Sequence, residues 1–467
     1  MKKYSMMSYP ITKFLPPVQT NYRCVPEMFV LVYDYMGRLG MKEMIRMMNL
    51  AFSIPLEGTL DVERLEWSLQ RLFEDEPLLR SYISKEKGSY YLVEKEDYRF
   101  TLSVSEVPGR NRIEKMKKVK EMLIEDAKND LNYFDPDFEQ TQFRLLKLDD
   151  NMHVLMFLGS HIFYDFGAFT SILARLMRYY NGSEKPGKRL ATFGDFIEEE
   201  NAYLNNEAGK KEIEYWRKEF ATYKRKRLPK DKKKAAVWKE EDSIAYFENE
   251  CLERVAANNK TSVFNVMMLA IQMAYAKHTN NKDTASNYVI SNRSEEKYRN
   301  TAGMLMRILS SRVVMEDDIT IAELQKMMRK KIGEGYLNHH AAADTVCNLP
   351  LLIIDESMGD IAGDLTFNGR PIDFQADINP QAIMKLCQKD TIMIMIMPAG
   401  DKKTVNLIGN TKNYGHHYKS IRDNILLAVR FMDRYPDKTF GEYMRSDVNI
   451  ENVDLVEDSE HIGLIAI

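Results

Sequence analysis

The chain has 467 residues, of which 44% are hydrophobic and 29% are charged, and its formal net charge at pH 7 is −3. This length allows two or three domains, or two large halves that share an interface, each with a sizeable core. A net charge so near zero produces no overall field that would favour nucleic acid or a membrane surface as a partner.

The cysteines and the apolar runs exclude further classes of protein. The four cysteines are far apart in sequence and form no Cys-x-x-Cys pair, so a secreted disulfide framework and a zinc knuckle are both disfavoured. The first ten residues lack the apolar stretch of a signal peptide, and no run of about 18 apolar residues exists. We therefore expect a cytoplasmic protein with no membrane span.

The first part of the chain alternates strand patterns with amphipathic helical patterns. After an irregular start with a candidate helix near residues 41–48, strands are predicted over 50–56 and 90–94, and helices over 62–73 and 113–129. Asp61 is suited to cap the first of these helices.

A strand–loop–helix unit over residues 153–176 carries the side chains best suited to chemistry. Residues 142–148 alternate as a strand, an Asp-Asp-Asn turn follows, and 153–158 return as a buried strand. His161 lies just beyond this strand, Asp165 comes four residues later, and a helical pattern begins directly afterwards. The sequence thus places a histidine in a loop between two buried elements, where catalytic groups are commonly mounted.

His161 has the chemistry of a general base. The pKa of histidine lies near neutral pH, so its imidazole can take a proton from a hydroxyl, amine or thiol and return it to a leaving group. A structural histidine is the simpler alternative. A nucleophile elbow of the Gly-x-Ser-x-Gly type is missing, and two ligands alone do not make a metal site.

Asp165 requires a cationic partner if its side chain turns back under the loop. A buried carboxylate is costly unless it is paired. Arg293 follows a predicted strand over 287–291 and is the best candidate for this partner.

A Gly-, Ser- and Pro-containing linker at residues 181–187 divides the chain into two predicted parts, 1–182 and 183–467. The second part again mixes helices with strands. Helices are predicted over 193–205, 212–223, 262–278, 321–336 and 418–432, and strands over 351–354, 365–368, 391–397 and 405–408. This mixture indicates an α/β class of the mixed α+β kind.

Three other segments have competing interpretations. The basic run 224–234 is either a solvated loop or a docking patch for an acidic partner, and its lack of aromatics disfavours single-stranded nucleic acid. His340 and Asp344 repeat the His-to-acid spacing, but we expect them to form an exposed pair on a continuing helix. His416 and His417 are predicted to lie in a loop, with the lining of a channel as the alternative.

The unit Ser160-His161-Ile-Phe-Tyr-Asp165 resembles the HHxxxDG motif of nonribosomal peptide synthetase condensation domains and their relatives in the HxxxD acyltransferase superfamily. Four further segments resemble this family in the same order: Leu56–Arg80, Asp195–Trp216, Ile290–Met304 and Val405–Asn410. The resemblance extends over about residues 50–432.

The resemblance implies a chloramphenicol-acetyltransferase-like fold, with two similar halves in a V and a tunnel between them. It implies that His161 deprotonates or orients an acceptor amine or hydroxyl that attacks a thioester, and that Asp165 is a structural residue paired with Arg293. The thioester donor would be acyl-CoA or the phosphopantetheine arm of a carrier protein acting in trans, with no permanently bound cofactor.

Two departures from the family motif leave two functions open. Ser160 replaces the first histidine, and Phe166 replaces the glycine, which is displaced to Gly167. By resemblance, these three residues would line the substrate tunnel. The chain is therefore either an acyltransferase that forms an amide or ester, or a degenerate module that binds a carrier protein or another partner.

Overall fold

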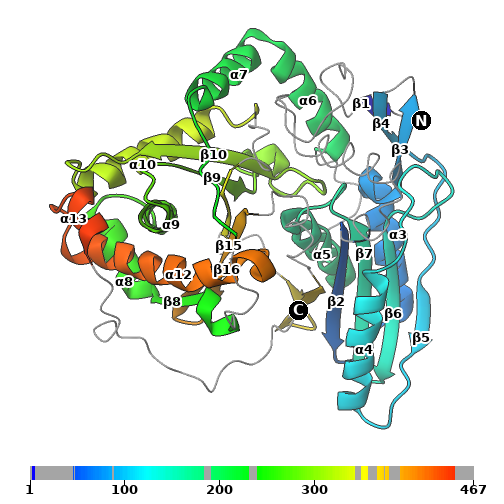
Figure 1. Ribbon diagram of the computed structural model, residues 1–467. Helices are drawn as coiled ribbons and strands as arrows, with labels where there is room; N and C mark the ends of the chain where they lie inside the picture. Colours follow the sequence, from blue (N-terminus) through cyan, green and yellow to red (C-terminus); the bar gives the residue numbers. More distant parts are fainter. Residues whose placement is uncertain are drawn as a thin grey trace.

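The computed structural model describes residues 3–5, 46, 48–86, 89–183, 191–230, 239–341, 349–355, 365–372, 374–377 and 390–446. These residues form two α/β halves arranged as a V (Figure 1), as the sequence predicts. The candidate helix near residues 41–48 lies almost entirely outside the described residues.

The N-terminal half is built on a five-stranded sheet with the order β14-β2-β7-β6-β5. Its strands are β2 (Asn49–Glu57), β5 (Ser103–Glu106), β6 (Gln142–Asp149), β7 (Met152–Ser160) and β14 (Gln375–Asp377). β5 and β6 are parallel, whereas the other neighbours are antiparallel. The predicted hairpin is therefore confirmed as β6 and β7, and all nine residues of β7 are buried.

Among the described residues, three helices accompany this sheet. They are α3 (Val62–Asp75), α4 (Arg112–Asp126) and α5 (Phe166–Asn181). Asp61 caps α3 as predicted, because its side chain accepts a hydrogen bond of 2.9 Å from the backbone N–H of Arg64. α3 packs against α5, while α4 contacts β2, β6 and β7.

A small three-stranded sheet adjoins this half, with the order β1-β4-β3. Its strands are β1 (Lys3–Ser5), β3 (Ser81–Glu86) and β4 (Ser89–Glu94). The 3-10 helix η1 (Pro77–Arg80) connects α3 to β3, where the proline ends the α-helical pattern.

The C-terminal half contains a six-stranded sheet with the order β10-β9-β11-β15-β16-β8. Its strands are β8 (Ile244–Glu248), β9 (Asp283–Ile290), β10 (Arg307–Val314), β11 (Leu351–Asp355), β15 (Ile392–Ala399) and β16 (Lys402–Ile408). The central strands β9, β11 and β15 run parallel to one another. Such strands are buried on both faces, which explains the continuous apolar sequence of β15.

Seven helices surround this second sheet among the described residues: α6 (Phe193–Asn205), α7 (Glu207–Phe220), α8 (Asn249–Asn258), α9 (Val263–Thr279), α10 (Ile321–Leu337), α12 (Thr411–Arg434) and α13 (Phe440–Arg445). α9 is the most deeply buried of them and packs against α12. None of the described helices combines the length and apolar character that crossing a lipid bilayer requires.

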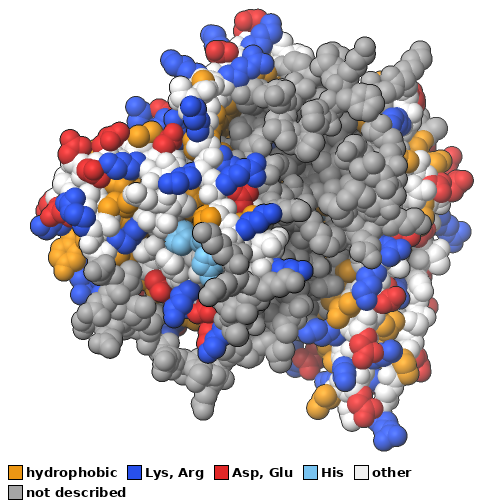
Figure 2. Space-filling view, viewed as in Figure 1, with side chains coloured by type: hydrophobic (Ala, Val, Ile, Leu, Met, Phe, Trp, Pro, Cys, Tyr) orange, Lys and Arg blue, Asp and Glu red, His pale blue; other side chains and the backbone are white. Residues whose placement is uncertain are grey.

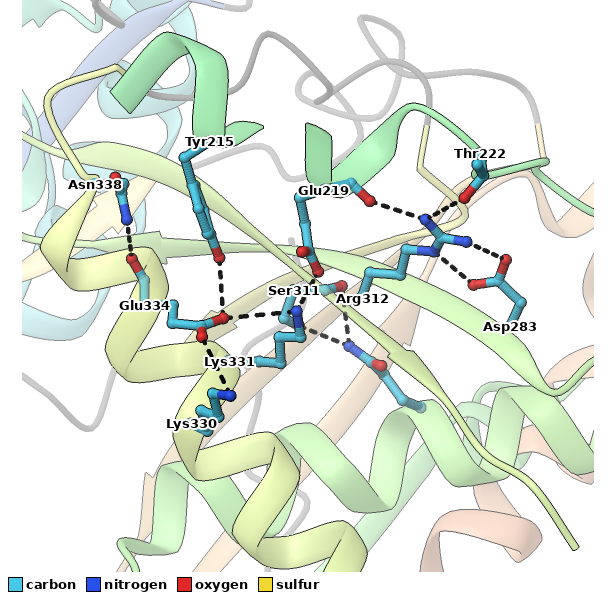
Figure 3. A network of polar contacts seen from close by, with 11 residues as sticks. Tyr215, Glu219, Thr222, Asp283, Ser311, Arg312, Lys330, Lys331, Glu334 and Asn338 are labelled. Carbon is cyan, nitrogen blue, oxygen red and sulfur yellow. Dashed lines mark hydrogen bonds and ion pairs between the residues drawn. The ribbon is translucent and has the colours of Figure 1, made fainter. Parts of the chain in front are cut away.

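A polar network joins α7 and α10 to the outer strands of this sheet (Figure 3). Lys331 of α10 donates to Glu219 of α7 at 2.6 Å and lies 3.5 Å from Glu334. Arg312 of β10 pairs with Asp283 of β9 at 2.8 Å and also donates to the backbone carbonyl of Glu219. These contacts fix both helices relative to strand β9, which leads to Arg293.

One short strand crosses between the halves. β14 follows the hairpin of β12 (Thr366–Phe367) and β13 (Arg370–Pro371), and it pairs antiparallel with β2 at the edge of the N-terminal sheet. The division at residues 182/183 stays a prediction. α5 ends there at Asn181 and is capped by Gly182, yet residues far beyond this position contribute to the N-terminal sheet.

Two local predictions were wrong. α10 ends at Leu337, so His340 lies beyond the helix, and Asp344 is outside the described residues. His416 and His417 lie within α12 and not in a loop. Burial of Tyr414 and Tyr418 extends this helix through Gly415, because tertiary packing overrides the low helix propensity of glycine.

Candidate active site

The loop that carries His161 is a tight turn at the end of β7. The backbone N–H of His161 donates to the carbonyl of Met48 at 2.7 Å, and that of Tyr164 donates to the carbonyl of Ser160 at 2.9 Å. Ile162, like Tyr164, is completely buried. The backbone around His161 is therefore held on both sides by hydrogen bonds and by buried apolar neighbours.

The environment of His161 favours its neutral form. Burial lowers the pKa of the imidazole below its usual value, while the charge of Asp165 and backbone hydrogen bonds at His161 and Tyr164 act in the opposite direction. Burial has the largest effect, because desolvation disfavours the imidazolium. A neutral imidazole at pH 7 is the form that a general base requires.

Asp165 caps helix α5 and is saturated with hydrogen-bond donors. Its Oδ1 accepts from the N–H of Ala168 at 2.7 Å, and its Oδ2 accepts from the N–H groups of Leu305 and Met306, each at 2.9 Å. Arg293 adds Nη1 at 2.9 Å from Oδ2 and Nη2 at 2.8 Å from Oδ1. With so many donors already bound, this carboxylate is placed to organise the loop and not to transfer protons.

Arg293 reaches Asp165 from the other half of the molecule. It is buried just beyond β9, and its guanidinium also donates to the carbonyl of Gly303 at 2.8 Å and to that of Ser291 at 3.1 Å. The preceding Asn292 has a left-handed backbone with φ of 54°, which turns the chain after β9. The structure thus brings together the two residues that the sequence pairs by charge.

Gly167, and not residue 166, occupies the position against Arg293. A Cβ atom added at Gly167 would lie 2.8 Å from Nη1 and 2.9 Å from Cζ of Arg293, closer than such contacts allow. The displaced glycine therefore still provides the space that the ion pair needs. Phe166 starts helix α5 with a half-exposed ring that lies tilted against Phe374, with 5.8 Å between ring centroids.

Ser160 is buried at the end of β7 and bonds to the backbone of the loop. Its Oγ accepts from the N–H of Ile162 at 3.2 Å and lies 3.4 Å from the carbonyl of Met48. The hydroxyl thereby contacts the same backbone segment that holds His161.

His340, from the second segment with the His-to-acid spacing, lies away from His161. His340 Nδ1 lies 3.2 Å from Glu212 Oε1, and its ring stacks on Tyr203 with 3.9 Å between centroids. Both rings line a small pocket of about 30 Å³ that lies beside Asn292 and does not include His161. This histidine is paired within the C-terminal half.

The basic run is partly structural. Arg225 pairs with buried Asp390 at 2.8 Å and donates to the carbonyl of Leu349, while Lys226 donates to the carbonyl of Thr279. Arg227 is exposed, and residues 231–234 lie outside the described part of the chain. On the face shown in Figure 2, basic and acidic side chains are interspersed over both halves.

Sequence reasoning missed Phe374 because it is more than 200 positions from Phe166. Only the pairing of β14 with β2 brings it to this site, with a centroid distance of 5.1 Å to Phe169. Within the described residues, no group of three or more His, Cys, Asp or Glu side chains could hold a metal ion.

Comparison with known proteins relates this architecture to peptide synthetases. Gramicidin S synthase 2 of Aneurinibacillus migulanus is 25% identical over 283 residues, which are 58% of this chain but only 6% of the synthase. The chain thus corresponds to a small part of that relative's length.

Solved structures share the fold at low sequence identity. The condensation domain of the monacolin K polyketide synthase MokA is 11% identical, with a TM-score of 0.69 over 94% of this chain and 99% of that one. The starter condensation domain of the rhizomide synthetase, solved as a variant in complex with C8-CoA, is 13% identical, with a TM-score of 0.65 over 89% and 96%.

The model of one protein family matches more than half of the chain. It is described as the condensation domain and spans residues 41–343, which include the β7–α5 unit and Arg293. The chain belongs to the condensation-domain family.

Proposed function

We propose that this protein is a condensation-type acyltransferase that moves an acyl group from a thioester to an amine or hydroxyl acceptor. The observation that carries the proposal is His161. Its imidazole lies at the end of β7 with a lowered pKa, in a loop that the Asp165–Arg293 ion pair fixes. Family membership supports the reaction class.

His161 acts as the general base in this reaction. As the acceptor attacks the thioester carbonyl carbon, the imidazole takes the proton from the attacking nitrogen or oxygen. The carbon–sulfur bond then breaks, and the thiolate leaves and takes up the proton from the imidazolium. The products are an amide or ester and a free thiol, and His161 returns to its neutral form.

The donor is a thioester of CoA or of a carrier protein's phosphopantetheine arm. Support for a carrier comes from the similarity to a gramicidin synthase, and support for CoA comes from the similarity to the domain solved with C8-CoA. Both donors present the same reacting group, so the role of His161 is the same with either.

The test is a His161→Ala variant assayed for thiol release and for the mass of the acylated acceptor. We expect the rate to fall by roughly 10²-fold or more, the usual contribution of a general base. His340→Ala is the matched control, because it removes a histidine that also lies near a carboxylate but belongs to another pocket. Robust transfer that survives His161→Ala unchanged would refute the assignment.

A binding module is the second candidate, and Ser160 favours it. A serine stands where the family motif has its first histidine, and its hydroxyl bonds to backbone groups of Met48 and Ile162. Such a module would bind a carrier protein without turnover. Intact-mass screening with acyl-CoAs, acyl-carrier proteins and varied acceptors separates the two, since any turnover rejects a purely binding role.

A further inference from the structure

Phe166 is more exposed to solvent than the other residues from Ser160 to Gly167, which join β7 to α5. The residues from Ile162 to Asp165 are buried, and so is Gly167, whereas the ring of Phe166 is 46% exposed. Phe166 opens helix α5 directly after Asp165 and therefore lies at the same end of the β7–α5 unit as His161. A large apolar ring left half in water at this position forfeits hydrophobic stabilisation that burial would provide.

A second aromatic ring is brought to Phe166 from the C-terminal half. Phe374 lies one residue before β14, whose pairing with β2 anchors the crossing segment. Its ring centroid is 5.8 Å from that of Phe166, 5.1 Å from Phe169 and 6.0 Å from Phe52. Phe52 and Phe169 stack at 3.7 Å and form the buried base of this cluster.

The chemistry of this cluster restricts what can contact it. Its four side chains are all unsubstituted phenyl rings, so they offer neither charge nor conventional hydrogen-bond partners. A charged amine or the amide groups of a pantetheine arm would lose hydration against the rings without compensation. An alkyl or aromatic group would bury both its own surface and the exposed ring of Phe166.

The position of Gly167 leaves residue 166 available for this role. The close approach to Arg293 requires a glycine only at 167, so the side chain at 166 is not constrained by the ion pair. Position 166 can therefore vary in size without disturbing Asp165.

We propose that Phe166, together with Phe374, is a specificity-determining wall that receives an apolar or aromatic group of the substrate reacting at His161. This inference rests on the proposed acyl transfer and adds the substrate class to it. The apolar group belongs either to the acyl chain of the donor or to the side chain of the acceptor. Because the pairing of β14 with β2 holds Phe374 beside Phe166, the wall forms only when this pairing is made.

The first experiment measures kcat/KM of the wild type and of Phe166→Ala with a series of acyl-CoA or acyl-pantetheine donors of increasing chain length. A second series varies the acceptor side chain with the donor held constant. We expect the preference between small and large substrates to change by roughly tenfold or more in one series, as expected for hydrophobic pockets. The series that responds identifies the source of the apolar group.

Tyr246→Ala provides the matched control, because Tyr246 on β8 has the same exposed fraction of 46% but lies in the other sheet. This variant should leave the dependence of kcat/KM on donor length and on acceptor side chain unchanged. Phe374→Ala should shift the same profile as Phe166→Ala, and the double variant should shift it by less than the sum, because the rings are in contact. Unchanged profiles in Phe166→Ala would overturn the inference, while the His161→Ala result judges the proposed reaction separately.

A binding measurement keeps the inference testable if the wild type shows no turnover with any pair. Non-hydrolysable acyl-pantetheine thioethers of graded length are then titrated calorimetrically, as are the free acceptors. An affinity that rises with apolar size in the wild type and loses this dependence in Phe166→Ala supports the wall. If the affinity depends on apolar size equally in the wild type and in Phe166→Ala, the proposed wall is rejected.

Discussion

Asp165 and Arg293 are 128 positions apart in sequence and form a buried two-point ion pair between the halves, with 2.9 Å and 2.8 Å between the paired atoms. Asp165 is the N-cap residue of α5, and Arg293 comes from the segment after β9. The same carboxylate caps α5 and accepts two backbone N–H groups of the segment before β10. One side chain therefore connects the loop of His161 to both sheets.

Replacing this carboxylate should be strongly destabilising. Asp165→Asn preserves a helix cap but leaves the buried Arg293 without a counter-charge, so we expect a loss of about 3–5 kcal/mol in the free energy of unfolding. Denaturant titration measures this loss. Asp61→Asn is the control, since Asp61 caps α3 with a similar bond but is exposed; similar losses in both variants would contradict the prediction.

A methyl group at Gly167 should disturb the same ion pair sterically. Gly167→Ala places a Cβ 2.8 Å from Arg293 Nη1, so the guanidinium must shift. We expect a loss of about 1–3 kcal/mol in unfolding free energy, the usual effect of overpacking, together with reduced acyl transfer.

Gly333→Ala is the matched control for this substitution, because Gly333 lies in α10 with open space around the added Cβ. Alanine there should leave stability unchanged or raise it by up to about 1 kcal/mol through helix propensity. Equal effects of the two substitutions in thermal and denaturant unfolding would argue against a tight contact at Gly167.

The pH dependence of acyl transfer should reflect the lowered pKa of His161. The general base works in its neutral form, and burial lets this form persist to a lower pH than for an ordinary histidine of pKa 6.5. We therefore expect kcat/KM to be constant near pH 7 and to fall only below pH 6.5. A profile of kcat/KM from pH 4.5 to 8.5 tests this, and an acidic limb centred at or above 6.5 would contradict it.

A second histidine should make folding stability depend on pH. Burial, followed by the charges of His417 and His416, lowers the pKa of His278 from 6.5 to about 4. Between these values the unfolded chain binds a proton that the folded protein excludes, so stability falls as the pH is lowered from 6.5 toward 4.

Urea unfolding at several pH values measures this slope, and His278→Gln should make it shallower. Ser420→Ala is the control, because it removes the 2.9 Å hydrogen bond to His278 Nδ1 but leaves the titrating ring in place. An identical slope in the wild type and in His278→Gln would refute the attribution to His278.

Local sequence patterns predict those parts of the site that are continuous along the chain. The apolar run of β7, the turn at His161 and the helical spacing of α5 are all local properties, and the cost of a buried acid selects Arg293 as a partner. Residues that meet through tertiary pairing are not predictable in this way. Phe374 reaches Phe166 only because three residues of β14 pair with β2.

The position of the glycine after Asp165 is a second feature that the sequence alone does not explain. From the sequence, Phe166 stands in the place of the family glycine. In the structure α5 starts at Phe166, Gly167 lies against Arg293, and Phe166 is half exposed. A glycine is required at 167 because the guanidinium of Arg293 lies against it. The spacing of residues within the motif does not predict where this guanidinium lies.

The crossing strand has a consequence for how the protein can be divided. β2 would be the edge of the N-terminal sheet without β14, and an uncovered edge strand is a template for pairing with other chains. A fragment that ends at the linker would expose the backbone of residues 51–53 and lose the ring of Phe374 above α5. The later half thus protects the earlier one from self-association, so the two should be produced and engineered as one polypeptide.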